Sequence, residues 1–271
     1  MIRGSTELVA IVGSPIAQVK SPENFNTWFA NNGRDLAMIA IDLQENALDA
    51  FLSTLRGWQN LRGCVVTVPY KQVLATRLDG VSDRAKALCS VNVIRREPDG
   101  HLLGDNVDGE GFLNAARRQG FQAAGKRALV VGCGGVGSAI AYALCEAGVN
   151  DLVLDDVSAE RADGLVERLG SLFPALRIER AYDSLADFDL LVNASPVGMG
   201  DSGELPLPAA MLESLQPGTY VADVVTSPEI TPLLEFARAR GCTIQTGPQM
   251  ALAQLGNLGA FMGATPLEIQ P

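Results

Sequence analysis

Residues 128–137 read ALVVGCGGVG, and this stretch decides the fold. A short β-branched apolar run is typical of a strand buried on both faces, as in a parallel sheet. It leads directly into G-x-G-x-x-G, after which Val136, Ile140 and Leu144 recur at helical spacing. Strand, glycine turn and helix in this order predict a dinucleotide-binding βα unit, with a strand–turn–helix that binds nothing as the alternative.

Each glycine of the motif has a physical task. Gly132 permits the tight turn, Gly134 lets the backbone approach a pyrophosphate, and Gly137 lets the helix pack close to the strand. The helix N-terminus that follows offers unpaired N–H groups and the positive end of its dipole to phosphates. Gly135 and Val136 lie in the same glycine-rich segment. We therefore expect these five residues to bind the cofactor.

A second apolar run ends in Asp155 and Asp156, about 20 residues after the glycine turn. An acidic residue at this distance binds the ribose hydroxyls of a dinucleotide. The alternative is an ordinary turn at the end of a strand. We expect both aspartates to belong to the cofactor site.

Composition narrows the class of protein. The chain has 271 residues, 47% apolar and 19% charged, which is typical of a globular protein with a full core. The net charge of −10 argues against nucleic acid or an acidic membrane as a partner. Since no apolar run approaches 18 residues and the N-terminus lacks a leader pattern, we expect a cytoplasmic enzyme.

Histidine and cysteine usage limits the chemistry. The single histidine, His101, lies in a turn signature and is expected to be exposed. One histidine excludes a His-based triad and a His-cluster metal site, so we expect no metal. The five cysteines form no C-x-x-C and are interpreted as small apolar residues in a reducing compartment.

The rest of the chain alternates strands with helices, which predicts α/β architecture. In the first part, Ser21 is expected to cap a helix with Pro22 at its first position, and Asp99-Gly100 predicts a hairpin. Beyond a connecting helix, six strands alternate with helices as a doubly wound parallel sheet requires. The expected strands are 8–12, 36–43, 63–68, 91–94, 101–103, 128–132, 151–155, 177–181, 188–193, 219–224 and 242–245. The last segment, 249–262, is expected to be helical.

Two segments have residues suited to proton transfer. Lys71 follows a strand that Pro69 stops, and ligands of open α/β sheets gather at such strand ends. Asp105 and Asp108 lie in a polar, glycine-bounded segment at the expected domain junction, where ligand clefts form. A carboxylate that orients a partly dehydrated lysine would suit alcohol–ketone chemistry. Taken singly, such a lysine is more often solvated, and such aspartates more often cap helices.

Several motifs together resemble the shikimate/quinate dehydrogenase family, in order and over nearly the whole chain. They are Gly13 to Pro22, 66–71 (VTVPYK), 90–92 (SVN), 104–109 (GDNVDG), 132–135 (GCGG), 193–199 (NASPVGM) and Met250 with Gln254. The resemblance implies a substrate domain of residues 1–108 plus 247–271 and a Rossmann-type domain of residues 109–246. It implies hydride transfer between a nicotinamide and the ring hydroxyl of a small anionic ring acid.

The resemblance also implies roles for single residues. Lys71 and Asp108 would be the catalytic pair. The substrate contacts would be Ser21, Thr67, Asn92 and Gln254, and the cofactor cleft would include Ser195, Val224 and Gly247. The oligomeric state stays open, with a homodimer as one candidate.

The sequence departs from the family pattern at positions that are usually polar. Val19 replaces one of two serines that hold the substrate carboxylate, Val65 replaces an asparagine, Val107 a threonine and Thr226 a tyrosine. A hydrogen bond to a charged group contributes roughly 1.5–3 kcal/mol, so one lost serine weakens carboxylate binding about ten- to a hundredfold. We expect poor acceptance of shikimate, or a relative with fewer polar groups as the preferred substrate.

Cofactor choice follows from the segment after the second strand of the nucleotide domain. NADP-using relatives carry an Asn-Arg-Thr cluster there, whereas this chain has Asp156, Val157 and Ser158. An aspartate accepts ribose hydroxyls and repels a 2′-phosphate, by about 4 kcal/mol at 4 Å before exposure reduces it. We expect NAD rather than NADP.

The leading hypothesis is an NAD-dependent oxidoreductase for shikimate, quinate or a close analogue. Two alternatives stay open from the sequence. One is an NAD-binding sensor that keeps the fold with little catalysis, and the other is a dehydrogenase for a related ring acid, such as an aminated one.

Overall fold

The computed structural model describes residues 2–269, which form two compact units. The first unit holds the described residues up to Val107 together with those from Gln254 onward, and the second runs from Asp108 to Ala253. The predicted α/β fold with two domains is confirmed.

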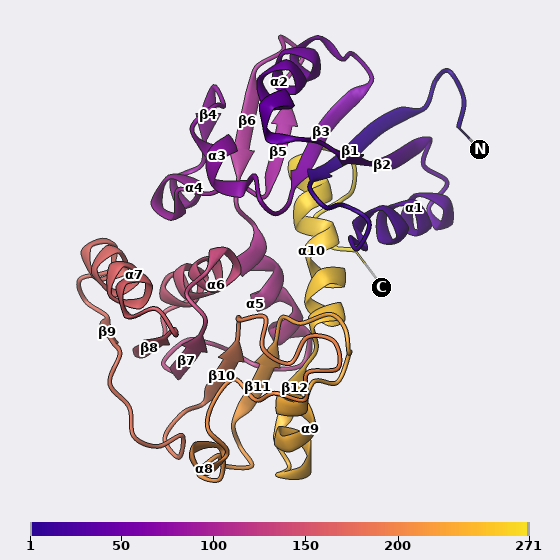
Figure 1. Ribbon diagram of the computed structural model, residues 1–271. Helices are drawn as coiled ribbons and strands as arrows, with labels where there is room; N and C mark the ends of the chain where they lie inside the picture. The colour runs from indigo at the N-terminus through magenta and orange to yellow at the C-terminus, as the bar shows by residue number, and fades with distance from the viewer. Residues whose placement is uncertain (1, 270–271) are drawn as a thin grey trace. The chain divides into compact units, whose positions relative to one another are not determined.

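The first unit is built on a six-stranded mixed sheet (Figure 1). The strand order is β2-β1-β3-β5-β6-β4, with β1, β2 and β3 parallel and β5 antiparallel to both β3 and β6. Its elements are β1 (Glu7–Gly13), α1 (Ser21–Asn31), β2 (Leu36–Asp42), a 3-10 turn (Glu45–Ala47), α2 (Leu48–Gly57), β3 (Leu61–Val66), α3 (Lys71–Ala75), β4 (Gly80–Val81), α4 (Asp83–Leu88), β5 (Val93–Arg96) and β6 (Leu102–Asp105). The predicted hairpin is confirmed as the β5–β6 pair. Strand β4 was not predicted, because two residues are too few to show an alternation of apolar and polar side chains.

Successive side chains of these strands point to opposite faces of the sheet, so the first unit has one apolar core on each face. Val9, Ile11 and Val65 face α1 and the last helix, α10 (Gly247–Phe261). Ala10, Val12 and their neighbours on β3 face the helices α2, α3 and α4 on the other side of the sheet.

The second unit is a doubly wound parallel sheet of six strands, as predicted. The order is β12-β11-β10-β7-β8-β9, and every neighbouring pair is parallel. Its elements are α5 (Asp108–Arg118), β7 (Arg127–Val131), α6 (Gly135–Glu146), β8 (Asp151–Asp155), α7 (Ala159–Leu172), β9 (Arg177–Glu179), β10 (Leu190–Asn193), α8 (Ala209–Leu212), β11 (Tyr220–Asp223), α9 (Pro232–Ala239) and β12 (Thr243–Gln245).

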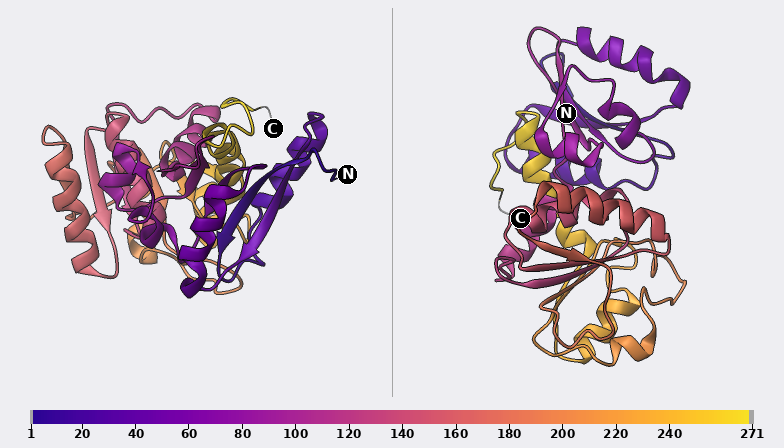
Figure 2. Two further views of the ribbon diagram at one scale, coloured as in Figure 1. Left: turned by 90° about the horizontal axis from the view of Figure 1, so that it is seen from above. Right: turned by 90° about the vertical axis from the view of Figure 1, so that its left-hand side faces the viewer.

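Helices cover both faces of this second sheet, as can be followed in Figures 1 and 2. Ala128 and Val130 of β7 pack with α5, α6 and α7 on one face, whereas Leu129 and Val131 pack with α8 and α9 on the other. Burial on both faces explains the continuous apolar runs of the sequence.

Helix α10 begins at Gly247, two residues earlier than expected, and belongs to both units. The sequence-based division assigned 247–253 to the first unit, whereas the structure groups them with the second. The physical reason is local packing, because Met250 lies in the core of the second unit. From Gln254 onward the helix packs in the first unit, where Leu255 and Leu258 join the core.

Candidate functional site

In the second unit, four neighbouring strands end in one row. Asn193 pairs with Val131 on one side and with Asp223 on the other, and Val131 pairs with Asp155. The order of strands reverses between β7 and β10, so the glycine turn after Val131 lies at a topological switch point. Ligands of open α/β sheets bind at the carboxyl ends of the strands at such a point.

Two of the motif glycines are required by close packing. Gly132 has φ of +101°, a conformation that favours glycine, and a Cβ there would lie 2.8 Å from the carbonyl carbon of Ala194. A Cβ on Gly137 would lie 1.7 Å from the carbonyl oxygen of Gly132, so only glycine lets α6 approach the turn this closely. The predicted roles of these two residues in the turn are therefore confirmed in the backbone.

The other two glycines have open space beside them. A Cβ added at Gly134 or Gly135 would meet no atom of the chain within 4 Å. Gly134 is the N-cap of α6, and the following twelve-residue helix points its first N–H groups toward this space. This arrangement fits the pyrophosphate of a dinucleotide, because helix dipole and backbone donors both favour an anion.

The two predicted ribose-binding aspartates already have partners in the chain. Asp156 is only 9% exposed and accepts hydrogen bonds from the N–H of Cys133 (2.7 Å) and of Ser158 (2.8 Å). Burial opposes its charged form, but these N–H groups and the Arg161 guanidinium lower the pKa of Asp156 overall. Asp155 accepts a hydrogen bond of 2.5 Å from the Tyr182 hydroxyl. Asp156 thus fastens the glycine turn to the loop after β8, a task that the sequence did not predict.

At the ends of β10 and β11, a buried polar network surrounds Asp223. The Asn193 amide donates to both oxygens of this carboxylate at 3.1 Å, and the Thr231 hydroxyl donates at 2.7 Å. Burial is the largest influence and raises the pKa of Asp223. The Ser195 hydroxyl donates to Asn193 Oδ1 at 2.6 Å. The sequence analysis placed Ser195 in the cofactor cleft, but only the strand register reveals that Asn193, to which Ser195 bonds, has Asp223 as its partner.

Val224 and Gly247, both expected in the cofactor cleft, lie side by side. A Cβ on Gly247 would lie 2.8 Å from the carbonyl oxygen of Val224. The start of α10 therefore packs against the segment that follows β11. Thr226, two residues further along, is exposed.

In the first unit, backbone hydrogen bonds anchor the segments that carry three of the predicted residues, Thr67, Asn92 and Lys71. The N–H of Thr67 donates to Val12, and the N–H of Val66 donates to the carbonyl of Asn92 at 2.7 Å. The carbonyl of Lys71, the first residue of α3, accepts from the N–H of Val91 at 2.8 Å. The lysine-bearing turn and the asparagine-bearing segment are thus held at one end of the sheet.

Asp105 organises the segment that leads to Asp108. Its carboxylate, only 5% exposed, accepts from Arg84, from the Ser82 hydroxyl and from the N–H of Asn106. Burial opposes the charged form, but Arg84 and Ser82 lower the pKa of Asp105 overall.

One residue further, the N–H of Val107 donates to Asn92 Oδ1 at 2.9 Å. The segment before Asp108 is therefore tied to a predicted substrate contact. Asp108 itself is buried, opens α5 and begins the second unit.

The three valines at usually polar positions, Val19, Val65 and Val107, lie in or beside one apolar cluster of the first unit. Val65 and Val107 are 5% and 2% exposed, and they pack with Leu255 in the core that Val19 borders. Of the other expected substrate contacts, Ser21 is half-buried and begins α1, and Gln254 lies on α10. The expected cap by Ser21 is wrong, because the N-cap is Lys20 and no side chain bonds to the helix end.

Family models match both units of this chain. Residues 11–94 match the shikimate dehydrogenase substrate binding domain, and residues 114–198 match shikimate / quinate 5-dehydrogenase. The shikimate dehydrogenase (NADP(+)) of Rubrobacter xylanophilus is 37% identical over 93% of this chain and 89% of its own length.

The chain belongs to the shikimate/quinate dehydrogenase family.

Solved structures of the shikimate/quinate dehydrogenase family and its relatives share the fold. Shikimate 5-dehydrogenase from Listeria monocytogenes, in complex with shikimate and NAD, is 29% identical, with a TM-score of 0.90 over 98% of this chain and 94% of that one. The 5-ketofructose reductase of a Gluconobacter strain is 26% identical, with a TM-score of 0.91 over 98% and 96%.

Membership of this family makes the protein an oxidoreductase that acts on a CH–OH group with a nicotinamide cofactor. In residues 2–269, no helix has the length and apolar character needed to cross a membrane. Within the same residues, histidine, cysteine and acidic side chains form no group of three suited to a metal ion.

Proposed function

We propose that this protein is an NAD-dependent dehydrogenase that interconverts the ring hydroxyl and ketone of shikimate, quinate or a close analogue. The observation that carries the proposal is the hydrogen bonding around Lys71. Val91 donates to the Lys71 carbonyl and Val66 to the Asn92 carbonyl, so the predicted base and a predicted substrate contact share one end of the sheet.

The chemistry assigned to the chain is proton transfer. In the oxidising direction Lys71 Nζ takes the proton that the ring hydroxyl loses, and the carboxylate of Asp108 orients the lysine. Thr67, Asn92, Ser21 and Gln254 are proposed to bind the ring. When bound, the nicotinamide cofactor accepts the hydride from the ring carbon.

The preference for NAD rests on Asp156 and Val157. Although burial opposes its charged form, two N–H donors and Arg161 lower the pKa of Asp156. A carboxylate at the position expected for a 2′-phosphate would repel that group, which supports NAD. The Val157 side chain is fully exposed and offers no cation to a phosphate. The Rubrobacter relative is named for NADP(+), whereas the Listeria structure contains NAD, so initial rates at equal concentrations of the two cofactors decide the point.

Val19, Val65 and Val107 support a substrate with fewer polar groups than shikimate. Val65 and Val107 belong to one apolar cluster that Val19 borders. The resemblance to the family implies hydrogen-bonding side chains at these three positions. A second candidate is therefore a hydroxy ketone without a carboxylate, favoured by the missing serine at position 19 and by the likeness to 5-ketofructose reductase.

The test is turnover by purified protein with NAD or NADP and a panel of shikimate, quinate, an aminated ring acid and 5-ketofructose. We expect Lys71→Ala to lower kcat by about 10²–10⁴-fold while cofactor affinity changes little. Lys86→Ala, which removes an exposed lysine from α4, is the matched control. Tight NAD binding without turnover on any member of the panel would contradict the proposal and favour a sensor.

A further inference from the structure

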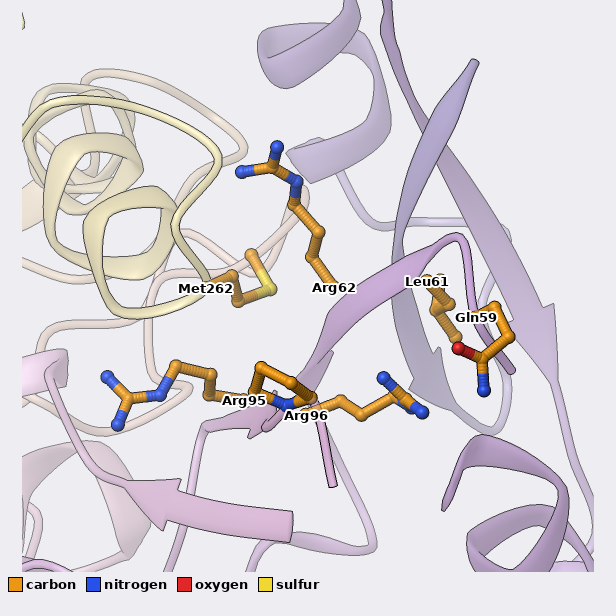
Figure 3. Close-up of a pocket in the computed structure, with 7 residues that line it drawn as sticks. Gln59, Leu61, Arg62, Arg95, Arg96 and Met262 are labelled. Atoms are coloured by element: carbon orange, nitrogen blue, oxygen red, sulfur yellow. The ribbon is translucent and has the colours of Figure 1, made fainter. Parts of the chain in front are cut away.

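Three arginines lie around a cavity of about 360 Å³ in the first unit, but their side chains do not converge. Figure 3 shows Met262 between the side chains of Arg62 and Arg95, whereas Arg96 extends the other way. The arginines therefore form no single binding site. Polar groups that do converge lie in the second unit, around the carboxylate of Asp223.

The carboxylate of Asp223 is surrounded by hydrogen-bond donors. Asp223 is the last residue of β11 and is only 1% exposed. The Asn193 amide donates to both of its oxygens at 3.1 Å, the Thr231 hydroxyl donates at 2.7 Å, and the N–H of Val225 donates at 2.9 Å. An ionised carboxylate only accepts hydrogen bonds, so this set of donors matches the charged form of Asp223.

These donors come from three segments of the second unit. Asn193 ends the neighbouring strand β10, where it pairs in register with Asp223. Val225 belongs to the segment after β11 and directly follows Val224. Thr231 is the N-cap of α9. One carboxylate thus joins the end of β10, the segment after β11 and the start of a helix.

The Asn193 amide passes this constraint on to the loop that follows β10. Because its Nδ2 faces Asp223, its Oδ1 accepts from the N–H of Ser195 at 3.1 Å and from the Ser195 hydroxyl at 2.6 Å. The same Nδ2 donates to the carbonyl of Val197 at 3.0 Å. If the amide were turned over, Nδ2 would meet the N–H of Ser195, which can only donate. The charge of Asp223 therefore sets the direction of the amide and holds residues 195–197.

The loop after β10 lies at the switch point of the sheet. A Cβ on Gly132 would lie 2.8 Å from the carbonyl carbon of Ala194, so this loop packs directly against the glycine turn. Each half of a doubly wound sheet binds one half of a dinucleotide, and the acidic residue after the second strand belongs to the adenosine half. Strands β7, β8 and β9 form that half here, which leaves β10, β11 and β12 for the nicotinamide half.

We propose that Asp223 is a positioning residue, which keeps Ser195 and Val224 in place against the nicotinamide half of the cofactor. This role rests on the proposed location of Ser195 and Val224 in the cofactor cleft. It does not depend on the choice between NAD and NADP or on the identity of the ring substrate.

The test is calorimetric titration of the full-length protein, which measures binding without turnover. The probes are the reduced cofactor that wild type binds more tightly, NADH or NADPH, and its adenosine half, ADP or adenosine 2′,5′-bisphosphate. Asp223→Asn keeps the shape but places an NH₂ group among donors. We expect its Kd for the reduced cofactor to rise about tenfold, and its Kd for the adenosine half to change less than about threefold. Equal rises for both probes would overturn the proposal, because they would indicate a loosened domain.

Asp189→Asn is the matched control. Asp189 directly precedes β10, at the opposite end of the strand from Asn193, and accepts from the Lys126 ammonium and the N–H of Arg127. Its loss affects the same strand away from both loops, so neither Kd should change. A tenfold rise for the reduced cofactor in this control would also overturn the role of Asp223.

An exchange variant, Asn193→Asp with Asp223→Asn, tests the direction of the network and restores pairing where the single variant fails to fold. The new carboxylate accepts from Ser195, and the new amide donates to that carboxylate, so only the bond to Val197 is lost. We expect the exchange to bind the reduced cofactor within about threefold of wild type. Binding as weak as that of Asp223→Asn alone, or weaker, would contradict the proposal.

Discussion

The guanidinium of Arg84 holds the carboxylate of Asp105 at two points, with Nε at 2.8 Å from Oδ1 and Nη2 at 2.6 Å from Oδ2. The pair joins α4 to the end of β6, directly before the segment that leads to Asp108. The same Oδ1 accepts the N–H of Asn106. The ion pair therefore fixes the backbone from which both Asn92 and Asp108 are positioned.

We expect Arg84→Gln to lower both stability and turnover. A buried carboxylate left without its partner costs roughly 1–3 kcal/mol, which urea unfolding measures. Because the segment before Asp108 loses its anchor, kcat should fall about tenfold or more, whereas KM for the cofactor stays unchanged. Arg77→Gln, which removes an arginine paired with the exposed Asp49, is the control and should change neither. Equal losses in both variants would contradict the positioning role.

The lowered pKa of Asp105 predicts a pH dependence of stability. Its pKa is lower in the folded than in the unfolded chain, so ionisation stabilises the fold above the unfolded value of about 3.9. This contribution is lost as the pH falls from about 4 toward the folded pKa. Urea unfolding should show Asp105→Asn less stable than wild type at pH 6, with a smaller gap at pH 3. A gap that is constant with pH would show that Asp105 does not act through its charge.

Two glycines of the cofactor motif should respond differently to alanine. The methyl group added by Gly134→Ala has no atom of the chain within 4 Å, so the free energy of unfolding should change by less than about 1 kcal/mol. The added methyl group occupies the space offered to the pyrophosphate, so KM for the cofactor should rise about tenfold. The methyl group added by Gly137→Ala clashes with the Gly132 carbonyl, so the free energy of unfolding should fall by more than about 2 kcal/mol. Unchanged cofactor KM in a well-folded Gly134→Ala would contradict the assigned phosphate position.

Cofactor preference should change when Val157 becomes a cation. Val157→Arg places a guanidinium on an exposed side chain beside Asp156, where a 2′-phosphate would bind. A hydrogen bond between charged groups contributes roughly 1.5–3 kcal/mol, so the ratio of kcat/KM for NADP over NAD should rise about tenfold or more. Val157→Gln, of similar length without charge, should leave the ratio nearly unchanged. The same rise in both variants would point to size rather than charge.

Most helices and strands were predictable, because the spacing of apolar residues in the sequence matches the faces that are buried in the structure. The runs around Val130 and Val153 are apolar throughout, since helices cover both faces of their sheet. The two-residue strand β4 carries no period and was missed. The cap at Ser21 was predicted wrongly, because residue type alone does not fix the backbone angle at the helix start.

The candidate site was predictable to the extent that its residues follow strand ends. Lys71 and Gly132 come after strands, and Asp155 is the last residue of β8. The bonds of Asp156 with Cys133 and of Asp223 with Asn193 could not be predicted, because these partners are distant in sequence and only the sheet register brings them together. Polar networks of this kind are tertiary contacts and have no local period.

The division of α10 between the two units has a consequence for synthesis of the chain. Leu255, Leu258 and Met262 complete an apolar core whose other members include Val9 and Ile11. A nascent polypeptide that has just emerged as far as Ala253 contains every residue of the second unit, while the first still lacks part of its interior. On the ribosome the part made earliest therefore matures last, because one apolar face of its sheet stays uncovered until α10 is complete, and that face is exposed to neighbouring chains until then.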